Sequence, residues 1–462
     1  MSKKKIVILN GARSADKHLS PILALLTDLL KTNIAAQVQI FSFSDITINQ
    51  CIGCFHCWVN TPGQCIHTAD AGESILQAVL DSDILVLFTP VIFGGYSAEL
   101  KRILDRFLPM ALPFLQKMHG EVHHPRRYAA FPHIIGIGIS QAPNDEITRC
   151  FRTLVGRNAV NASTSYSAGV FYHAESPDRL RQGFLELFST TEDLPGRDEL
   201  EALMARINLN PPAKISLGKR RALLIIGSPK RKMPSTSAVL GEQLLRQLDK
   251  HGWQTSSLLL REDLLTPQGQ QRLLCHVDEA ETVIAAFPLY LDALPSGMTK
   301  AFELISSHRE IAREKQPKNF LAIVNNGLPE AYQNGVALAI CRFFALQCDM
   351  TWAGGLAFGA GEQLISGNPL TGFRGFRGTM RPPLYYVVRA LNMAAHSLSK
   401  GHAIPEKAAQ ILSNKPVPLI SWALWHWFLM RKGNKLLKNE ARKNGLDIRS
   451  MYQQPISRDN ES

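Results

Sequence analysis

The sequence has no apolar run long enough to cross a membrane. The longest uncharged apolar stretch near its C-terminal end, 416–430, has 15 residues, whereas a spanning helix needs about 20. The four apolar residues that follow the first lysines, 6–9, are too few for the core of a signal peptide. These absences predict a mature cytoplasmic protein.

Acidic residues are scarce at the C-terminal end. The 462 residues contain 51 Lys and Arg against 39 Asp and Glu, a formal net charge of +12. Residues 371–462 hold 15 of these cations and 5 of the acids, so 15 − 5 = +10 of the charge lies there. No zinc-finger spacing or RNA-binding aromatic motif accompanies it, so a nucleic-acid partner is not expected. A solvated helical surface, an anionic lipid surface and a phosphorylated cofactor are the alternatives.

Three buried strands recur in the two halves of the chain. Amphipathic segments such as 21–31 and 237–251 lie between them. Continuous apolar strands that alternate with amphipathic helices are typical of parallel sheets covered on both faces. We therefore predict an α/β fold of two doubly wound domains, with ligands beyond the carboxyl ends of the strands. The paired strands are 3–11 with 219–227, 81–90 with 281–288, and 134–140 with 320–327.

The repeat and the composition divide the chain into three parts. The first domain is expected at 1–210 and the second at 215–367, with a proline-containing linker at 208–214. A glycine-rich connector, 368–378, opens a helical and basic C-terminal extension that occupies 368–462. This division agrees with the roughly 100–200 residues that are usual for one domain.

The clearest ligand motif is Gly227–Ser237, which follows a predicted strand and opens a predicted helix. Small residues let the backbone N–H groups converge, and a helix N-terminus favours a phosphate. The Gly-Lys-Ser/Thr ending of a Walker loop and the spaced glycines of a dinucleotide fingerprint are both absent. The alternative is a polar turn that only caps the helix. The candidate phosphate-binding residues are Gly227, Ser228, Lys230, Ser235, Thr236 and Ser237.

The Gly-Ser-Pro-Lys start and Ser-x-Ser ending of this motif resemble the FMN phosphate loop of the NADPH-dependent FMN reductase family, in the flavodoxin-like superfamily. Phe287–Pro295 is similar to that family's loop beside the isoalloxazine ring, and so is Thr89–Gly95, which is followed by Lys101–Arg106. Asn325–Ala331 resembles the third loop, which borders the flavin in family members. The resemblance covers residues 3–365 and implies two tandem flavodoxin-like domains. It implies ring contacts from Pro288, Leu289, Tyr290, Asn325, Asn326 and Gly327, and in the first half from Pro90, Val91, Ile92, Phe93 and Gly94.

The two halves are not equivalent as flavin sites. The first loop, Gly11–Lys17, lacks the Ser-x-Ser/Thr ending, although Gly11 and Arg13 are its candidate phosphate contacts. In the second half, Leu291 and Asp292 are expected to replace the glycines beside the ring, where their bulk would crowd a flavin. At least one FMN is expected, and the sequence leaves open which half holds it.

Four of the eight cysteines lie close together, with the spacing C-x2-C-x2-C-x7-C. The interval from the first strand to the proline loop runs from Ile6 to Pro90 in the first half and from Leu223 to Pro288 in the second, so it is longer in the first half by close to the length of the cysteine segment. The segment is therefore expected to be an insertion before the helix that precedes the Pro90 strand. It resembles the compact motif of iron–sulfur flavoproteins, whose family places a [4Fe–4S] cluster close to FMN; zinc and an unmetallated thiol loop are the alternatives. The candidate ligands are Cys51, Cys54, Cys57 and Cys65.

Two helices are predicted in the extension, at Pro383–Ser399 and Val417–Arg431. Ser421–Phe428 contains three of the six tryptophans and precedes a run of basic residues. Tryptophan beside a basic amphipathic stretch suits peripheral membrane contact. The alternative is a helix docked on its own domain or across a homodimer. The ending Lys438–Gly445 resembles the tail of some tandem flavodoxin-like reductases, which favours docking.

These features predict an FMN-dependent oxidoreductase with NAD(P)H as co-substrate. Electrons would pass to a small acceptor, such as a quinone, a flavin, or an azo or nitro compound, or to a cysteine-held cluster. Hydride transfer resides in the cofactor, so the sequence demands no side-chain acid or base and identifies no catalytic residue. Two other classes stay open: a non-catalytic scaffold with the same folds, and a flavin electron carrier that lacks a nicotinamide site.

Overall fold

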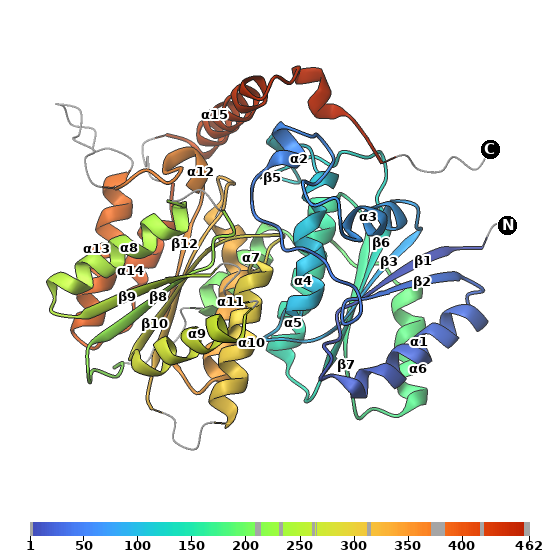
Figure 1. Cartoon of the computed structure of the whole chain (residues 1–462), viewed down its shortest axis with the longest axis horizontal. Helices are drawn as coiled ribbons and strands as arrows, with labels where there is room; N and C mark the ends of the chain where they lie inside the picture. Colours follow the sequence, from blue (N-terminus) through green and yellow to red (C-terminus); the bar gives the residue numbers. More distant parts are fainter. Residues whose placement is uncertain are drawn as a thin grey trace. The chain divides into compact units, whose positions relative to one another are not determined.

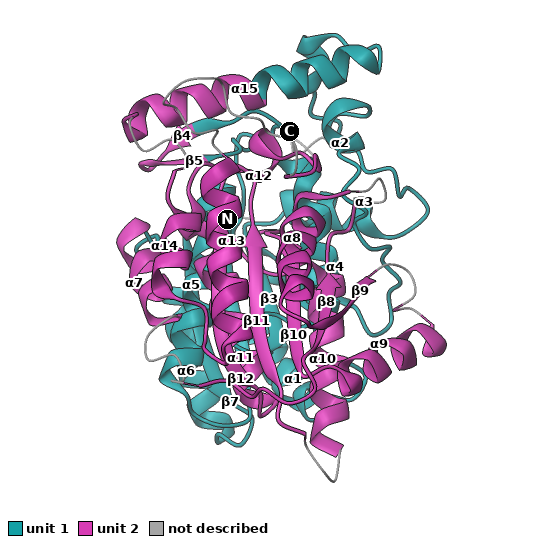
Figure 2. Ribbon diagram, turned by 90° about the vertical axis from the view of Figure 1, so that its left-hand side faces the viewer, with its two compact units in different colours: residues 1–116, 123–196, 434–462 teal, residues 117–122, 197–433 magenta. Residues whose placement is uncertain are grey.

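The computed structural model describes residues 3–207, 214–230, 234–260, 264, 266–311, 316–370, 384–415 and 420–456. The chain divides into two compact units, which Figure 2 colours separately. The first unit comprises Met1–Gln116, His123–Gly196 and Asn434–Ser462, and the second comprises Lys117–Val122 and Arg197–Gly433. The expected linker at 208–214 and connector at 368–378 lie largely outside the described residues.

The first unit contains a sheet of five parallel strands in the order β2-β1-β3-β6-β7 (Figure 1). Counted within this sheet alone, the order is 2-1-3-4-5, which is the flavodoxin-like doubly wound order. Every residue of β3 is buried, as expected for a parallel strand between two helical layers. The strands are β1 (Lys5–Asn10), β2 (Gln37–Ser42), β3 (Ile84–Pro90), β6 (His133–Ser140) and β7 (Tyr166–Tyr172).

The second unit repeats this topology. Its five parallel strands have the order β12-β11-β10-β8-β9, which read from the other edge is again 2-1-3-4-5. The prediction of two tandem flavodoxin-like sheets is therefore confirmed. The strands are β8 (Arg221–Ile226), β9 (Gln254–Leu259), β10 (Thr282–Pro288), β11 (Asn319–Asn325) and β12 (Thr351–Phe358).

Helices cover both faces of the first sheet. The core on one face joins β1, β3 and β6 to α1 (Ser20–Thr32) and α6 (Pro177–Ser189). α5 (Asp145–Ala162) packs against the other face, where a Cβ on Gly136 would come within 2.4 Å of a Val155 methyl group. The remaining α-helices of the unit's main body are α2 (His56–Val59), α3 (Gly72–Leu80) and α4 (Ala98–Leu104).

The second sheet has the same two layers. α8 (Thr236–Lys250), α13 (Leu384–Ser399) and α14 (Glu406–Ser413) share the core on one face. On the other face, Phe320 of β11 packs with Phe302 and Phe344, with ring centroids 4.0–5.6 Å apart. Phe302 and Phe344 belong to α10 (Ser296–Ile311) and α11 (Gly335–Gln347), and α9 (Pro267–Glu279) lies beside α10.

The compact units do not follow the expected domain limits. α13 follows the fifth strand of the second sheet and packs on α8, just as α6 follows β7 and packs on α1. The second doubly wound domain thus includes α13 rather than ending at 367. α7 (Arg197–Ile207), expected in the first domain, packs on α11, and the Trp352 indole donates to the Ile207 carbonyl at 2.9 Å. Buried apolar stripes hold both helices in the second unit.

The cysteine segment is an insertion, as expected. Residues 43–71 connect β2 to α3 in the first unit, whereas the corresponding connection in the second unit, between β9 and α9, is made by 260–266 alone. The first unit therefore carries an extra loop, which includes the four clustered cysteines, at the carboxyl end of its edge strand β2.

The C-terminal part ends in a 22-residue helix, α15 (Trp422–Lys443), whose first half belongs to the second unit and whose second half belongs to the first (Figure 2). Among the described helices, none combines the length and the apolar composition needed to cross a bilayer. One side of α15 is buried, which confirms that this helix is docked on its own chain.

Candidate functional site

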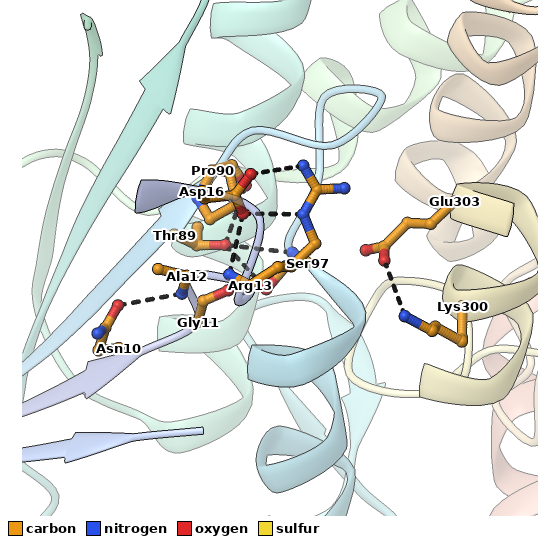
Figure 3. Close-up of polar contacts among 10 residues, drawn as sticks. All are labelled: Asn10, Gly11, Ala12, Arg13, Asp16, Thr89, Pro90, Ser97, Lys300 and Glu303. Atoms are coloured by element: carbon orange, nitrogen blue, oxygen red, sulfur yellow. Dashed lines mark hydrogen bonds and ion pairs between the residues drawn. The ribbon is translucent and has the colours of Figure 1, made fainter. Parts of the chain in front are cut away.

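In the loop after β1, Arg13 binds a carboxylate of the same loop, that of Asp16. The Asp16 carboxylate accepts hydrogen bonds from the Arg13 backbone N–H at 2.9 Å, from Nε at 2.8 Å and from Nη2 at 2.7 Å (Figure 3). Burial acts to raise the pKa of Asp16, but these bonds outweigh it and bring the pKa below its ordinary value. A backbone N–H and a guanidinium are the groups that also bind phosphate oxygens.

Neighbouring polar groups fix this loop to the loop after β3. The Ser97 hydroxyl donates to the Gly11 carbonyl at 2.6 Å, and the Ser97 N–H donates to the Thr89 hydroxyl at 3.1 Å (Figure 3). A Cβ on Gly11 would lie 2.5 Å from the Leu100 Cβ, so only glycine fits there. The Asn10 side chain accepts from the Ala12 N–H at 3.0 Å. The backbone of the loop is therefore rigidly placed at the carboxyl ends of β1 and β3.

The loops beside the predicted flavin ring have the same backbone in both units. Each is a tight turn closed by a bridge, between Ile92 and Gly95 in the first unit and between Tyr290 and Ala293 in the second. The central residues are left-handed, with φ of 52° and 83° at Phe93 and Gly94, and of 45° and 58° at Leu291 and Asp292. This register matches Gly94 with Asp292 and Gly95 with Ala293. The expected replacement of glycines by Leu291 and Asp292 was thus wrong by one position, because Leu291 corresponds to Phe93.

In the second unit, the hydroxyls of the phosphate motif bond within the protein. The Ser235 side chain caps α8 by accepting from the Ala238 N–H at 3.2 Å. The Ser237 hydroxyl bonds the Asn325 side-chain oxygen at 2.7 Å, and the Thr236 hydroxyl donates to the Gly361 carbonyl at 3.3 Å. Residues 231–233 of the motif lie outside the described residues. The side-chain oxygens of Ser235, Thr236 and Ser237 therefore bond to groups of the protein itself.

A short segment after β12 packs onto the same motif. It includes α12 (Gly361–Leu364), whose Glu362 carboxylate accepts from Lys230 Nζ at 2.7 Å. A Cβ on Gly361 would come within 3.0 Å of the Thr236 methyl group, and one on Gly367 within 2.1 Å of the Pro234 carbonyl oxygen. In the second unit, protein atoms thus occupy the surroundings of the expected phosphate contacts.

The third loops also differ. In the first unit, residues 141–144, between β6 and α5, are exposed. In the second, Asn325 and Asn326 are buried, the Asn326 amide donates to the Glu330 carbonyl, and its backbone carbonyl accepts from the Gly361 N–H at 2.8 Å. Gly327 is exposed, but its carbonyl accepts from Gln363 at 2.8 Å. The described part of the first unit therefore leaves its strand ends more open to solvent.

The structure places the remaining predicted ring contacts at the strand ends of their own units. Pro90 and Pro288 end β3 and β10, and the N–H groups of the next residues, Val91 and Leu289, donate to the Ile139 and Asn325 carbonyls. Gly227 and Ser228 follow β8 and are buried. Sequence analysis missed Asp16, Ser97 and Glu362. Only Asp16 had a local signal, an acid three positions after Arg13.

One buried arginine, Arg106, holds the two ends of the cysteine segment. Arg106 is 1% exposed and donates to the Asp70 carboxylate at 2.9 Å and to the carbonyls of Asn49 and His67 at 3.0 Å. Burial acts to raise the Asp70 pKa, but the bonds from Arg106, Asn49 and Gly72 bring it to about 2. Asn49, His67 and Asp70 flank the cysteines on both sides. Arg106 thus closes the inserted loop at its base.

The four thiols lie close enough to affect one another. Burial, followed by the charges of Asp105, Cys65 and Cys54, raises the pKa of Cys51 to about 12, and burial likewise raises the pKa of Cys57. Within the described chain, no three His, Cys, Asp or Glu side chains are arranged around a single metal ion. A [4Fe–4S] cluster uses four thiolates on four separate irons, and the soft sulfur donors of this loop fit that chemistry.

Comparison with known proteins identifies a family in the first unit. Residues 4–130 match the family described as NADPH-dependent FMN reductase. This range contains β1, the Arg13–Asp16 loop, the cysteine segment and the turn after β3. The expected resemblance to this family is confirmed over that part of the chain.

Two curated relatives are iron–sulfur flavoproteins from archaea. One, from Methanocaldococcus jannaschii, is 37% identical over 78 residues, which cover 17% of this chain and 39% of that protein. The other, from Archaeoglobus fulgidus, is 30% identical over 118 residues, or 25% of this chain and 51% of that protein. The chain thus spans about half or less of the length of the curated relatives it matches.

Solved structures of similar fold are oxidoreductases of low sequence identity. An NAD(P)H:quinone oxidoreductase from Methanothermobacter marburgensis is 11% identical, with a TM-score of 0.32, over 42% of this chain and 100% of that chain. An azoreductase from Bacillus anthracis is 13% identical, with a TM-score of 0.30, over 40% of this chain and 96% of that chain. The fold assignment rests on the strand order of the two sheets.

Proposed function

Starting from the match of residues 4–130 to the FMN reductase family, we propose that this protein is an FMN-dependent oxidoreductase whose first unit holds one FMN. The observation that carries the proposal is the loop after β1, where the Arg13 N–H and guanidinium bind a carboxylate. A phosphate is an anion of similar oxygen geometry and suits the same donors. The second unit is proposed to bind no FMN, because the side-chain oxygens of Ser235, Thr236 and Ser237 bond to buried groups of its own chain.

The residues of the first unit would bind and orient the cofactor. Arg13 and the backbone after Gly11 would hold its phosphate, and the turn at Pro90–Gly95 would contact its ring. Pro90, Phe93 and Gly94 are buried, whereas Val91 and Ile92 are half-buried and can offer apolar surface to a flat ring. FMN, when bound, supplies the capacity to take up a hydride from a nicotinamide and to pass electrons to a quinone, flavin, azo or nitro compound.

The decisive experiment compares matched cation variants of the two units. Purified wild-type protein is expected to bind one FMN per chain, measured by its visible spectrum and by titration of the apoprotein. Arg13→Ala should weaken FMN binding by about a hundredfold, since charge-assisted bonds to an anion contribute about 1.5–3 kcal/mol. Lys230→Ala should leave binding unchanged. Circular dichroism of both variants controls for folding.

Several outcomes would contradict the proposal. If Lys230→Ala loses FMN and Arg13→Ala does not, the FMN site is in the second unit, as the Gly227–Ser237 motif predicts. Colourless protein that takes up no FMN would favour the scaffold alternative. Anaerobic titration with NADPH and with NADH then tests the co-substrate: a bound flavin that neither donor bleaches would indicate an electron carrier.

The cysteine segment is proposed to hold a [4Fe–4S] cluster through Cys51, Cys54, Cys57 and Cys65. Support comes from the four mutually close thiols and from Arg106, whose positive charge interacts with Cys51 and Cys65. Metal binding requires thiolates, so Cys51 and Cys57, whose pKa values burial raises, would lose their protons to the solvent as the cluster binds. Iron and acid-labile sulfide should be found in protein purified and reconstituted without oxygen. Their absence, with FMN binding intact, would leave an unmetallated thiol loop.

A further inference from the structure

The buried side of α15 follows a single helical stripe. Trp425 and Leu429 are at most 2% exposed and pack with Ala360 of the second unit. Farther along the helix, Leu437 and Ala441 join the apolar cluster around Cys57 and Trp58 of the first unit. The spacing of four positions between these residues keeps them on one side of the helix. This side accounts for the docking of the helix.

The opposite side is apolar in its first half and basic in its second. Leu424, Trp427 and Phe428 are 50%, 53% and 45% exposed. The basic half begins at Arg431, whose guanidinium lies 5.4 Å from the centroid of the Trp427 ring. At about 100° per residue, the residues of this outer face form one continuous strip along the helix. They are Leu424, Trp427, Phe428, Arg431, Lys432 and Lys435.

Large exposed aromatics are unusual on a helix that already buries another face. The docked stripe explains Trp425 and Leu429, and the Phe428 ring stacks on Trp425 with centroids 6.1 Å apart. These contacts still leave about half of the Leu424, Trp427 and Phe428 side chains exposed. A clustered apolar strip on a solvated surface marks an interaction site. The six cations and single acid of Trp422–Lys443 give the helix a charge of 6 − 1 = +5. The partner must therefore accept both aromatic side chains and several cations.

We propose that the outer face of α15 binds the surface of an anionic lipid bilayer. Tryptophan and phenylalanine insert at the level of the headgroups, while lysine and arginine pair with lipid phosphates at the surface. The helix would lie parallel to the membrane, with its docked face toward the protein. This proposal is independent of whether either unit holds FMN.

Charge favours a membrane over a second copy of the chain. In a two-fold dimer the same patch appears on both sides of the contact. Arg431, Lys432 and Lys435 would then enter an interface that also contains their copies, and no residue of the outer face is acidic. An anionic lipid surface supplies the opposite charge along the whole strip.

The test uses the full chain and co-sedimentation with vesicles of phosphatidylcholine alone, or of phosphatidylcholine mixed with phosphatidylglycerol. Wild-type protein should bind only the anionic vesicles, with a blue shift of tryptophan fluorescence, and should dissociate as salt is raised. A Trp427→Ser, Phe428→Ser variant should bind about a hundredfold more weakly, because two exposed apolar anchors are lost. A Lys432→Glu, Lys435→Glu variant should lose binding to the anionic vesicles.

A matched control uses a cation of the same unit away from the strip. Lys407 is exposed on α14, so Lys407→Glu should leave vesicle binding nearly unchanged. Failure of wild-type protein to bind anionic vesicles would overturn the proposal, as would equal binding by the aromatic variant. Sedimentation equilibrium adds a further check: a dimer that Trp427→Ser dissociates would identify a second copy as the occupant and also overturn it.

Discussion

The two units share a strand order but differ in what their strand ends do. In the first, the Arg13 backbone N–H and guanidinium donate to the carboxylate of Asp16, and the third loop at 141–144 is exposed. In the second, the corresponding loops are bonded to one another and to α12. A flavodoxin-like sheet therefore does not by itself imply a ligand. A ligand can bind only where the polar groups at the strand ends can exchange their protein hydrogen-bond partners for atoms of the ligand.

This difference has a simple energetic origin. A ligand that enters the second unit must replace several buried protein hydrogen bonds, and each donor left without a partner costs about 1–3 kcal/mol. In the first unit, a phosphate has to displace one carboxylate, and the same donors then bind the phosphate.

The largest expected effect is a loss of stability when the ion pair that anchors the cysteine segment of the first unit is broken. Asp70→Asn should destabilise the protein by about 3–5 kcal/mol, because it leaves the buried Arg106 guanidinium without its charge partner. Urea unfolding monitored by circular dichroism measures this loss. Asp28→Asn is the matched control, since its ion pair with Arg181 is exposed and contributes less than about 1 kcal/mol.

The same ion pair predicts a pH dependence. The pKa of Asp70 falls from 3.8 to about 2 in the folded protein, so the unfolded state takes up the proton first as the pH decreases. The stabilisation is complete above about pH 4 and is lost as the pH falls through about 2. Equal acid sensitivity of wild type and Asp70→Asn would show that this carboxylate does not carry the effect.

The second expected effect tests whether Asp16 occupies the phosphate position. Asp16→Asn removes the competing charge while leaving an oxygen that can accept from the Arg13 N–H. FMN should then bind about tenfold more tightly, equivalent to about 1.4 kcal/mol. Titration of apoprotein, followed by flavin fluorescence, measures the change, with Asp28→Asn as the charge control. Weaker binding would mean that Asp16 instead positions Arg13 for the phosphate.

The smallest effect compares the two equivalent turns. Leu291 is left-handed, with φ of 45°, a conformation that costs a non-glycine residue about 1–2 kcal/mol. Glycine loses more chain entropy on folding, about 0.5–1 kcal/mol. Leu291→Gly should thus stabilise the protein by about 0.5–1 kcal/mol, whereas Gly94→Ala, at φ of 83°, should destabilise it. Leu291→Ala keeps the strain and should not stabilise; if it matches Leu291→Gly in thermal unfolding, side-chain crowding is responsible.

Sequence patterns predicted the strands well because each buried strand is a continuous apolar run, as in 84–88 and 283–287. They also predicted the insertion at the cysteines, because the interval between equivalent strands can be compared in the two halves of the chain. The end of the second domain was missed. α13 lies far from β12 along the chain, and its apolar stripe is equally typical of an extension and of the last helix of a doubly wound domain.

The site was harder to predict than the fold. Ser235 and Thr236 have the residue types of a phosphate loop, but hydroxyls also cap helices and bond carbonyls. Which role they take depends on Gly361, which is distant along the chain. The Arg13–Asp16 pair is local, yet composition alone does not say that the carboxylate bonds the backbone N–H as well as the side chain.

Arg106 also determines how the two ends of the cysteine segment are held together. By bonding the carbonyls of Asn49 and His67, one guanidinium ties together the chain just before the first clustered cysteine and the chain just after the last. These two bonds close the cysteine segment into a loop. The chain entropy lost by closing this loop is therefore lost when the protein folds, not when a ligand binds. The two ends of the segment are therefore held together before any ligand binds.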